Sequence, residues 1–122
     1  MTASERWEHR FLYSFLIGRC DRYGNELDAD VVEDGLRELG WRLKRALGGA
    51  TRIRSLEAEG QTLQWAAEQT ALMIAIVVGD QELRADSLVA ELEPWLVETF
   101  RQDEVWVAKD EWRLFIARRS AS

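Results

Sequence analysis

The sequence is poor in the residues on which disulfides, metal sites and most acid–base catalysis depend. Among 122 residues it has one cysteine and one histidine. Cys20 alone cannot form an intrachain disulfide. The spacing of His9 and Cys20 matches no zinc-ligand motif. They lie at opposite ends of a predicted strand, roughly 30 Å apart, so they cannot act as base and nucleophile. We therefore predict no catalytic residues, no metal site and no cofactor.

Long hydrophobic runs are also missing. No apolar run reaches the roughly 18 residues that a membrane span needs, so we expect no membrane association. Residues 1–10 are polar and charged, which predicts that no signal peptide is present and that the protein is cytoplasmic. Fourteen arginines against two lysines indicate a GC-rich coding sequence, and hence a bacterial or phage origin.

Basic residues are outnumbered, 16 to 22, and the net charge is −6. Residues 80–111 carry ten acids and three bases. This excess of acid argues against nucleic-acid binding as the main activity, and the chain lacks the Lys/Arg-Gly-Phe-type string of RNA-binding plait domains. The acidic residues suit a face presented to a basic partner protein. The alternative is that they only keep the chain soluble.

An unbroken apolar run marks the centre of the predicted fold. Residues 71–78 are eight apolar residues followed by Gly79 and Asp80, which is typical of a central strand covered on both faces. Residues 11–17 are rich in aromatic and branched side chains and predict another strand. Residues 50–65 predict a half-exposed strand with a bend.

Two segments have the apolar spacing of amphipathic helices. In residues 31–47 a leucine stripe predicts a helix, with Asp30 and Glu33 as its capping pair and Gly48-Gly49 at its end. In residues 85–99 a second stripe predicts another helix, which Pro94 either kinks or divides. Residues 105–107 and 112–117 then predict a terminal hairpin.

The order strand, helix, strand, strand, helix, strand, strand predicts an α+β fold, a ferredoxin-like plait. Its sheet would be mainly antiparallel, with four to five strands and two helices on one face. We expect a single domain over residues 9–117, with flexible termini at 1–8 and 118–122. The six tryptophans are predicted to lie mainly in the core, although such rings are also enriched at interfaces.

Four strings, FLYSFLIG, GGATRIRSLEAEGQTLQW, ALMIAIVV and ETFRQDEVWV, occur in an order that resembles a bacterial family of small plait domains of unknown function. The resemblance spans residues 11–107. The Gly-Gln-Trp of that family is interrupted here over residues 60–65, and the family is often exported, which is not expected of this chain. The resemblance implies the plait fold and adds nothing about activity.

The favoured functional hypothesis is a non-enzymatic interaction protein, an inhibitor or regulator. Its second sheet face is predicted to be covered by another copy, giving a homodimer, or by a larger protein with a basic surface. In composition it is similar to small phage- or plasmid-encoded inhibitors of bacterial defence systems. The predicted partner-binding residues are Glu91, Glu98, Asp103, Glu104, Trp106, Asp110 and Glu111.

The alternative is a small-ligand-binding protein or small enzyme of the dimeric plait type. Its pocket would lie near the loop of residues 19–25, which is the most chemically varied stretch of the chain. The candidate ligand-binding residues are Arg19, Asp21, Arg22 and Tyr23. This loop lacks the ligand spacing of a calcium site, and no glycine-rich phosphate motif precedes a helix.

Overall fold

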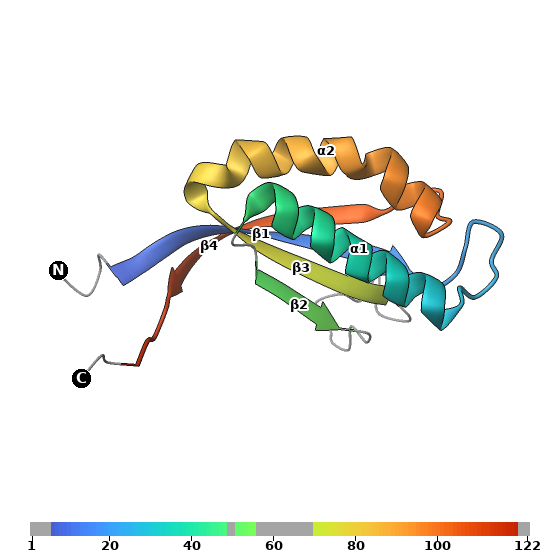
Figure 1. Ribbon diagram of the computed structural model, residues 1–122, viewed down its shortest axis with the longest axis horizontal. Helices are drawn as coiled ribbons and strands as arrows, with labels where there is room; N and C mark the ends of the chain where they lie inside the picture. The colour runs from blue at the N-terminus through green and yellow to red at the C-terminus, as the bar shows by residue number, and fades with distance from the viewer. Residues whose placement is uncertain (1–5, 49–50, 56–69, 120–122) are drawn as a thin grey trace.

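The computed structural model describes residues 6–48, 51–55 and 70–119 (Figure 1). Within them the elements follow one another in the order of a split βαβ unit. They are β1 (Trp7–Gly18), α1 (Ala29–Leu47), β2 (Thr51–Ser55), β3 (Thr70–Val78), the short 3₁₀ helix η3 (Gly79–Gln81), α2 (Glu82–Thr99) and β4 (Trp106–Phe115).

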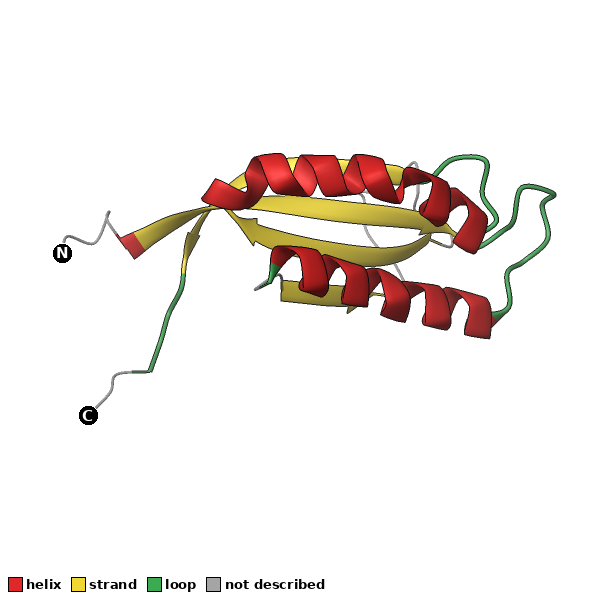
Figure 2. Cartoon of the chain, turned by 45° about the horizontal axis from the view of Figure 1, so that its top comes forward, coloured by secondary structure: helices red, strands yellow, loops and turns green. Residues whose placement is uncertain are grey.

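The strands form a four-stranded sheet in the order β2-β3-β1-β4. Each pair of neighbours is antiparallel. Both helices lie over the same face of this sheet (Figures 1 and 2). This connectivity and layering is the ferredoxin-like arrangement, so the predicted α+β plait class is confirmed.

The core fills the space between the sheet and the two helices. Successive side chains of a strand point to opposite faces, so each central strand sends every second residue into it. Each helix adds one apolar stripe. The strand residues are Phe11, Tyr13, Phe15 and Ile17 of β1 and Ala71, Met73, Ala75 and Val77 of β3, and the largest helix contributions are Leu36, Leu39, Leu43, Leu47, Leu92 and Leu96.

The prediction that residues 71–78 are covered on both faces is confirmed for the face toward the helices, and the other face is partly buried. In β3 the buried residues alternate with Leu72, Ile74 and Ile76, which are half-buried, and the strand ends at the exposed Val78. The helices cover one face of the strand, and neither described helix reaches the other. An apolar run with one partly exposed face is the pattern expected of a strand that meets another molecule.

The helix ends differ from the predictions. The first helix begins at Ala29, with Asp28 at the N-cap, so the predicted Asp30–Glu33 capping pair does not form there. Asp30 instead lies in the first turn, where a negative charge suits the helix dipole. Gly48 ends this helix as predicted, with a φ of 70°. The second helix runs from Glu82 to Thr99 without a division at Pro94.

The predicted terminal hairpin was wrong. Residues 106–115 form the single strand β4, which pairs with β1 from Trp106 opposite Leu16 to Phe115 opposite Trp7. Charged residues at 109–111 suggested a turn, but β4 is an edge strand, where charged side chains are common. Because β1 is long, it provides backbone hydrogen-bond partners along the whole length of β4. Of the strand predicted over residues 50–65, the structure describes β2, Thr51–Ser55, and the remainder with its predicted bend lies outside the described residues.

The prediction that the tryptophans serve mainly the core was also wrong. Of the described tryptophans, Trp95 packs against the core as a half-buried side chain. The others are 43–62% exposed, namely Trp7, Trp41, Trp106 and Trp112. Trp65 lies outside the described residues. Large exposed aromatic rings are costly to leave in water and are enriched at interfaces.

Candidate protein-binding surfaces

The face of the sheet that neither described helix covers is one candidate surface, called here the open sheet face. Residues directly opposite each other in an antiparallel pair lie on the same face, so the strand registers define its members. Its described side chains are Glu8, Arg10, Leu12, Ser14 and Leu16 of β1, Leu72, Ile74, Ile76 and Val78 of β3, and Trp106, Ala108, Asp110, Trp112 and Leu114 of β4.

The open sheet face is apolar and carries little net charge. Trp106 and Trp112 are 51% and 43% exposed and stand six residues apart on the edge strand. At one end of the face, Arg10 forms an ion pair with Glu8. Asp110 has no ion pair with any described residue. The face therefore offers two exposed aromatic rings on β4 and half-buried aliphatic side chains on β3, with one unpaired charge, and between them Leu12 and Leu16 of β1 are only 6% exposed. Large aromatic rings of this kind are enriched at interfaces.

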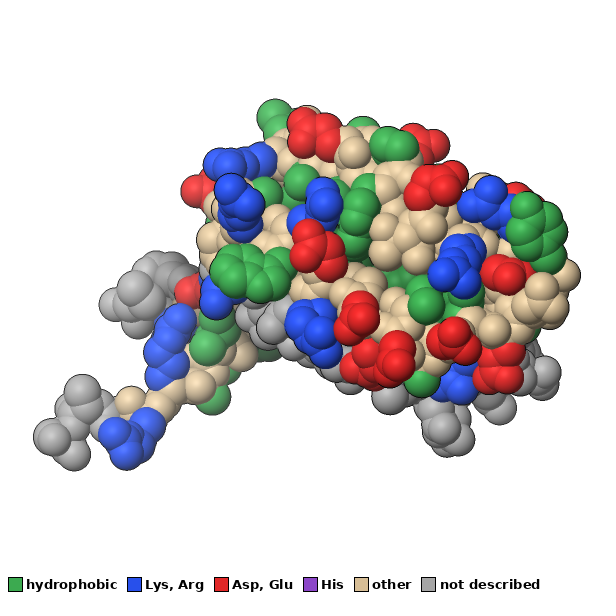
Figure 3. Space-filling model, turned by 45° about the vertical axis from the view of Figure 1, so that its right-hand side comes forward, with side chains coloured by type: hydrophobic (Ala, Val, Ile, Leu, Met, Phe, Trp, Pro, Cys, Tyr) green, Lys and Arg blue, Asp and Glu red, His purple; other side chains and the backbone are tan. Residues whose placement is uncertain are grey.

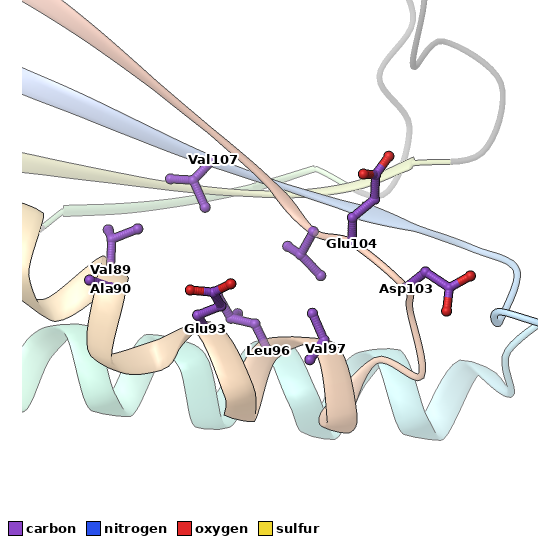
Figure 4. A pocket seen from close by; sticks show the side chains of 9 residues that line it. Val89, Ala90, Glu93, Leu96, Val97, Asp103, Glu104 and Val107 are labelled. Atoms are coloured by element: carbon purple, nitrogen blue, oxygen red, sulfur yellow. The ribbon is translucent and has the colours of Figure 1, made fainter.

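A second candidate surface lies between α2 and the start of β4, on the helix side of the sheet (Figure 4). It is a cavity of about 300 Å³, called here the acidic groove. Figure 4 shows valine and leucine side chains from both elements turned toward the space between them. The lining residues are Val89, Ala90, Glu93, Leu96 and Val97 of α2, Asp103, Glu104 and Val105 of the connection, and Val107 of β4.

The three carboxylates of the acidic groove have no hydrogen-bonded or ion-paired partner among the described residues. Other acids of the same region do: Glu98 lies 3.7 Å from Arg22, and Glu82 lies 2.6 Å from Lys109. The groove thus combines an apolar lining with uncompensated negative charge, a combination that suits a cation with an apolar stem.

Gln102 fixes the connection that carries Asp103 and Glu104. Its backbone N–H donates to the carbonyl of Val97 at 2.9 Å. Its side-chain amide donates to the carbonyl oxygens of Cys20 and Phe100, each at 2.7 Å, and lies 3.3 Å from that of Gly18. One side chain therefore ties the end of α2 to the end of β1 and positions the acidic end of the groove.

The Gln102→Ala variant is expected to lose about 1–3 kcal/mol of unfolding free energy. The substitution leaves half-buried carbonyl oxygens without their donor, which costs about this much. Urea unfolding followed by circular dichroism measures the loss. Gln81→Ala is the matched control, because no contact of the Gln81 side chain is described. Equal stability of the two variants would contradict the assigned role of Gln102.

A polar network on the helix side joins α2 to β1 and β4. The Tyr13 hydroxyl donates to Asp86 Oδ1 at 2.6 Å, and Lys109 Nζ donates to both Asp86 oxygens at 3.0 and 3.1 Å. Burial and the Asp86 carboxylate raise the pKa of Tyr13 to about 12. Hydrogen bonds to Glu82 and Asp86 raise the pKa of Lys109. The Tyr13 hydrogen bond, followed by that of Lys109, lowers the pKa of Asp86.

These shifts move every group of the network away from neutral pH. A general acid or base works best with a pKa near the operating pH, so the arrangement suits a structural tie between elements. Tyr13 holds its proton more tightly in the folded chain, so its contribution to stability is complete below pH 10. That contribution is lost as the pH rises from 10 to about 12.

The wild-type protein is therefore expected to lose about 2–3 kcal/mol more stability between pH 10 and 12 than the Tyr13→Phe variant. Phenylalanine keeps the buried ring and removes the titrating hydroxyl. Unfolding free energies measured in urea at pH 8, 10, 11 and 12 give the comparison. Parallel pH profiles for the two proteins would contradict the assignment.

The four predicted ligand-binding residues do not converge on one pocket. Arg19 lines a cavity of about 190 Å³ with Glu26, Leu27 and Glu33, which is smaller than the roughly 300–1,000 Å³ of small-molecule sites. Asp21 Oδ1 instead accepts hydrogen bonds from the N–H groups of Tyr23 and Asn25, at 2.8 and 2.9 Å.

The backbone hydrogen bond from Asn25 is the main cause of a lowered pKa at Asp21, so this carboxylate shapes its own loop. The Arg22 side chain approaches Glu98, while its N–H donates to the carbonyl of Arg101 at 2.7 Å. The Tyr23 side chain is 80% exposed. These positions favour a structural role for the loop.

The seven predicted partner-binding residues fall on several surfaces. Because strand residues alternate between faces, Trp106 and Asp110 lie on the open sheet face, whereas Glu111 lies on the helix side, 2.6 Å from His9 Nε2. Asp103 and Glu104 belong to the acidic groove. The remaining two are Glu91, beside a shallow hollow between α1 and α2, and Glu98, next to Arg22.

Acidic side chains therefore do not form one continuous face, and on the side seen in Figure 3 they interleave with basic ones. Sequence reasoning missed Glu93 and the apolar lining around it. A usable signal was present, because residues 89, 93 and 97 repeat at a spacing of four and so lie on one face of a helix.

Comparison with known proteins identifies no relative. No family model matches the chain, and no curated protein matches it, so the resemblance to a bacterial plait family stays a prediction. Among solved structures, a de novo designed protein with ferredoxin fold, LFR1 1, determined by solution NMR, matches 94% of this chain and 94% of its own. The two are 13% identical, with a TM-score of 0.43.

Neither described helix is both long and apolar enough to cross a membrane. In the same part of the chain, no three histidine, cysteine, aspartate or glutamate side chains are placed to hold one metal ion.

Proposed function

We propose that this chain is a non-enzymatic protein-binding protein that pairs with a second copy of itself through the open sheet face. The observation that carries the proposal is the exposure of Trp106 and Trp112 on β4, on the same face as the half-buried Leu72, Ile74 and Ile76 of β3, which no described helix covers. Exposed apolar patches of this kind on a small domain mark interaction sites.

Charge makes the open sheet face the most suitable place for a second copy to bind. Two chains of net charge −6 repel each other over most of their surfaces. The open sheet face carries one unpaired charge among its described residues, Asp110, so two copies meet there with the least repulsion. A two-fold arrangement would stack the sheets about 10 Å apart, as in sheet packing within domains.

The wider role that we propose is that of a regulator or inhibitor in a bacterial or phage setting, acting in the cytoplasm. Its support is the small, acidic chain together with two surfaces suited to binding protein.

Sedimentation velocity over a range of protein concentrations tests the pairing. We expect the sedimentation coefficient to rise from that of one chain to that of two. We also expect added sodium chloride to strengthen pairing, because salt screens repulsion between acidic chains and leaves apolar burial intact. A single-chain value at every concentration and salt level would overturn the proposal.

A further inference from the structure

We propose that the acidic groove binds an arginine or lysine side chain carried by a basic segment of a partner protein. The groove faces the helix side of β4, whereas Trp106 and Trp112 face the opposite side. It therefore remains accessible when the open sheet face is paired, and the inference does not depend on that pairing.

The size and lining of the groove fit one long cationic side chain. Its volume of about 300 Å³ is at the lower limit of small-molecule sites, roughly 300–1,000 Å³. Val89, Val97, Val105 and Val107 line it with apolar surface. Arginine and lysine bury their methylene stems against such surface while the charged head stays near water.

The charge of the groove selects the sign of its ligand. Glu93, Asp103 and Glu104 line it from α2 and from the connection to β4, and none is paired with a described residue. All three side chains are exposed, and in Figure 4 Glu93 lies apart from Asp103 and Glu104. A guanidinium or ammonium group that enters the groove is attracted by this negative charge and forms charge-assisted hydrogen bonds with the carboxylate that it reaches.

A backbone carbonyl of α2, beside the groove, adds to the preference for a ligand that donates hydrogen bonds. Pro94 lies inside α2 and has no N–H to donate to the carbonyl of Ala90, four residues earlier. Ala90 is exposed and lines the groove. The groove thus includes a helix residue whose carbonyl lacks its usual partner, an acceptor that suits the multiple N–H groups of arginine.

The arrangement suits an organic cation better than a metal ion. The described residues include no group of three ligands placed to hold one metal. Much of the lining is also apolar. Apolar surface provides no ligand for a hydrated metal ion, but it provides contact area for the methylene stem of a side chain. An unstructured or extended basic segment of a partner could insert one residue without rearranging either protein.

Titration of ¹⁵N,¹³C-labelled protein with a synthetic peptide tests the proposal. The probe is acetyl-Ala-Gln-Leu-Arg-Leu-Gln-Ala-amide, and the comparison peptide has citrulline in place of arginine. Citrulline keeps the shape of the side chain and removes its charge. We expect the arginine peptide to shift the methyl signals of Val89, Val97, Val105 and Val107, and to bind at least tenfold more tightly than the citrulline peptide.

Two matched double variants separate groove binding from general attraction to an acidic protein. In Glu93→Gln/Glu104→Gln the two substitutions remove groove charge, and the arginine peptide should bind about tenfold more weakly, because exposed ion pairs each contribute modestly to affinity. In Asp34→Asn/Asp80→Asn the same charge is removed elsewhere on the exposed surface, and binding should change less than about twofold.

Two outcomes would overturn the inference: equal binding of the arginine and citrulline peptides, or equal loss of affinity in the two double variants. Both variants exchange exposed groups for amides of similar shape, so folding is expected to be unaffected. Amide spectra recorded before each titration check this expectation. The titration reports the groove even if the chain sediments as a monomer, so failure of the pairing proposal and failure of this one are distinguishable.

Discussion

The double variant Trp106→Glu/Trp112→Glu is expected to be monomeric at concentrations where the wild-type protein is paired. Tryptophans at the centre of an interface typically contribute 2 kcal/mol or more each. Loss of 2 kcal/mol weakens binding about 30-fold. In a two-fold dimer each substitution occurs twice, and the four introduced carboxylates repel across the interface, so the combined loss should exceed about a thousandfold.

The control for this variant is Trp41→Glu. Trp41 is 62% exposed and lies on α1, in the helix layer. The substitution makes the same chemical change on the opposite side of the molecule, so pairing should persist. Sedimentation equilibrium of the three proteins gives the dissociation constants. If Trp41→Glu dissociates the protein and the double variant leaves it paired, the helix layer is the interface and our assignment is incorrect.

The Phe100→Ala variant is expected to lose about 3–5 kcal/mol of unfolding free energy, because truncating a fully buried phenylalanine leaves a cavity. Phe100 follows α2, is 0% exposed, and packs edge-on against Trp95 with ring centroids 6.1 Å apart. Its ring also contacts α1 at Gly35, where an added Cβ would lie 2.5 Å from a ring carbon. This contact joins the two helices over the sheet.

The Gly35–Phe100 contact predicts a change of sign in a double-mutant cycle. In the wild-type background Gly35→Ala should destabilise the protein by about 1–3 kcal/mol, because the methyl group overpacks a ring that cannot move. In the Phe100→Ala background the same substitution should stabilise it by up to about 1 kcal/mol, because alanine is the better helix former. Additive effects in urea unfolding would contradict the packing described for this contact.

Most of the order of helices and strands could be predicted from the sequence, because the spacing of apolar residues matches the side chains that are buried in the core. The leucine stripe of residues 32–47 lies in the core, and the alternation in residues 11–17 places every second side chain against the helices. The mid-strand charges of β4 could not be interpreted correctly from the sequence. Lys109 and Glu111 resemble a turn, and only the tertiary structure supplies their partners, Glu82, Asp86 and His9.

The candidate surfaces were only partly predictable, for a similar reason. The sequence indicated that one sheet face needs a cover, and it placed Trp106 and Asp110 among the partner-binding residues. The sequence did not show that Glu111 lies on the opposite face of the sheet from these two residues. Neighbouring residues of a strand point to opposite faces, so the face is known only once the strand and its register are known. Asp103 and Glu104 were predicted as well, but Glu93 joins them only because α2 crosses beside the start of β4.

The measurement that tests the central claim most directly is an isotope-filtered NOE experiment on a mixture of ¹³C-labelled and unlabelled wild-type chains. It detects contacts only between different copies. We predict intermolecular signals between the methyl groups of Leu72, Ile74 and Ile76 and the rings of Trp106 and Trp112. Intermolecular signals confined to the helix layer, for example from Trp41 or Leu83, would contradict the account, and so would their absence at millimolar concentration.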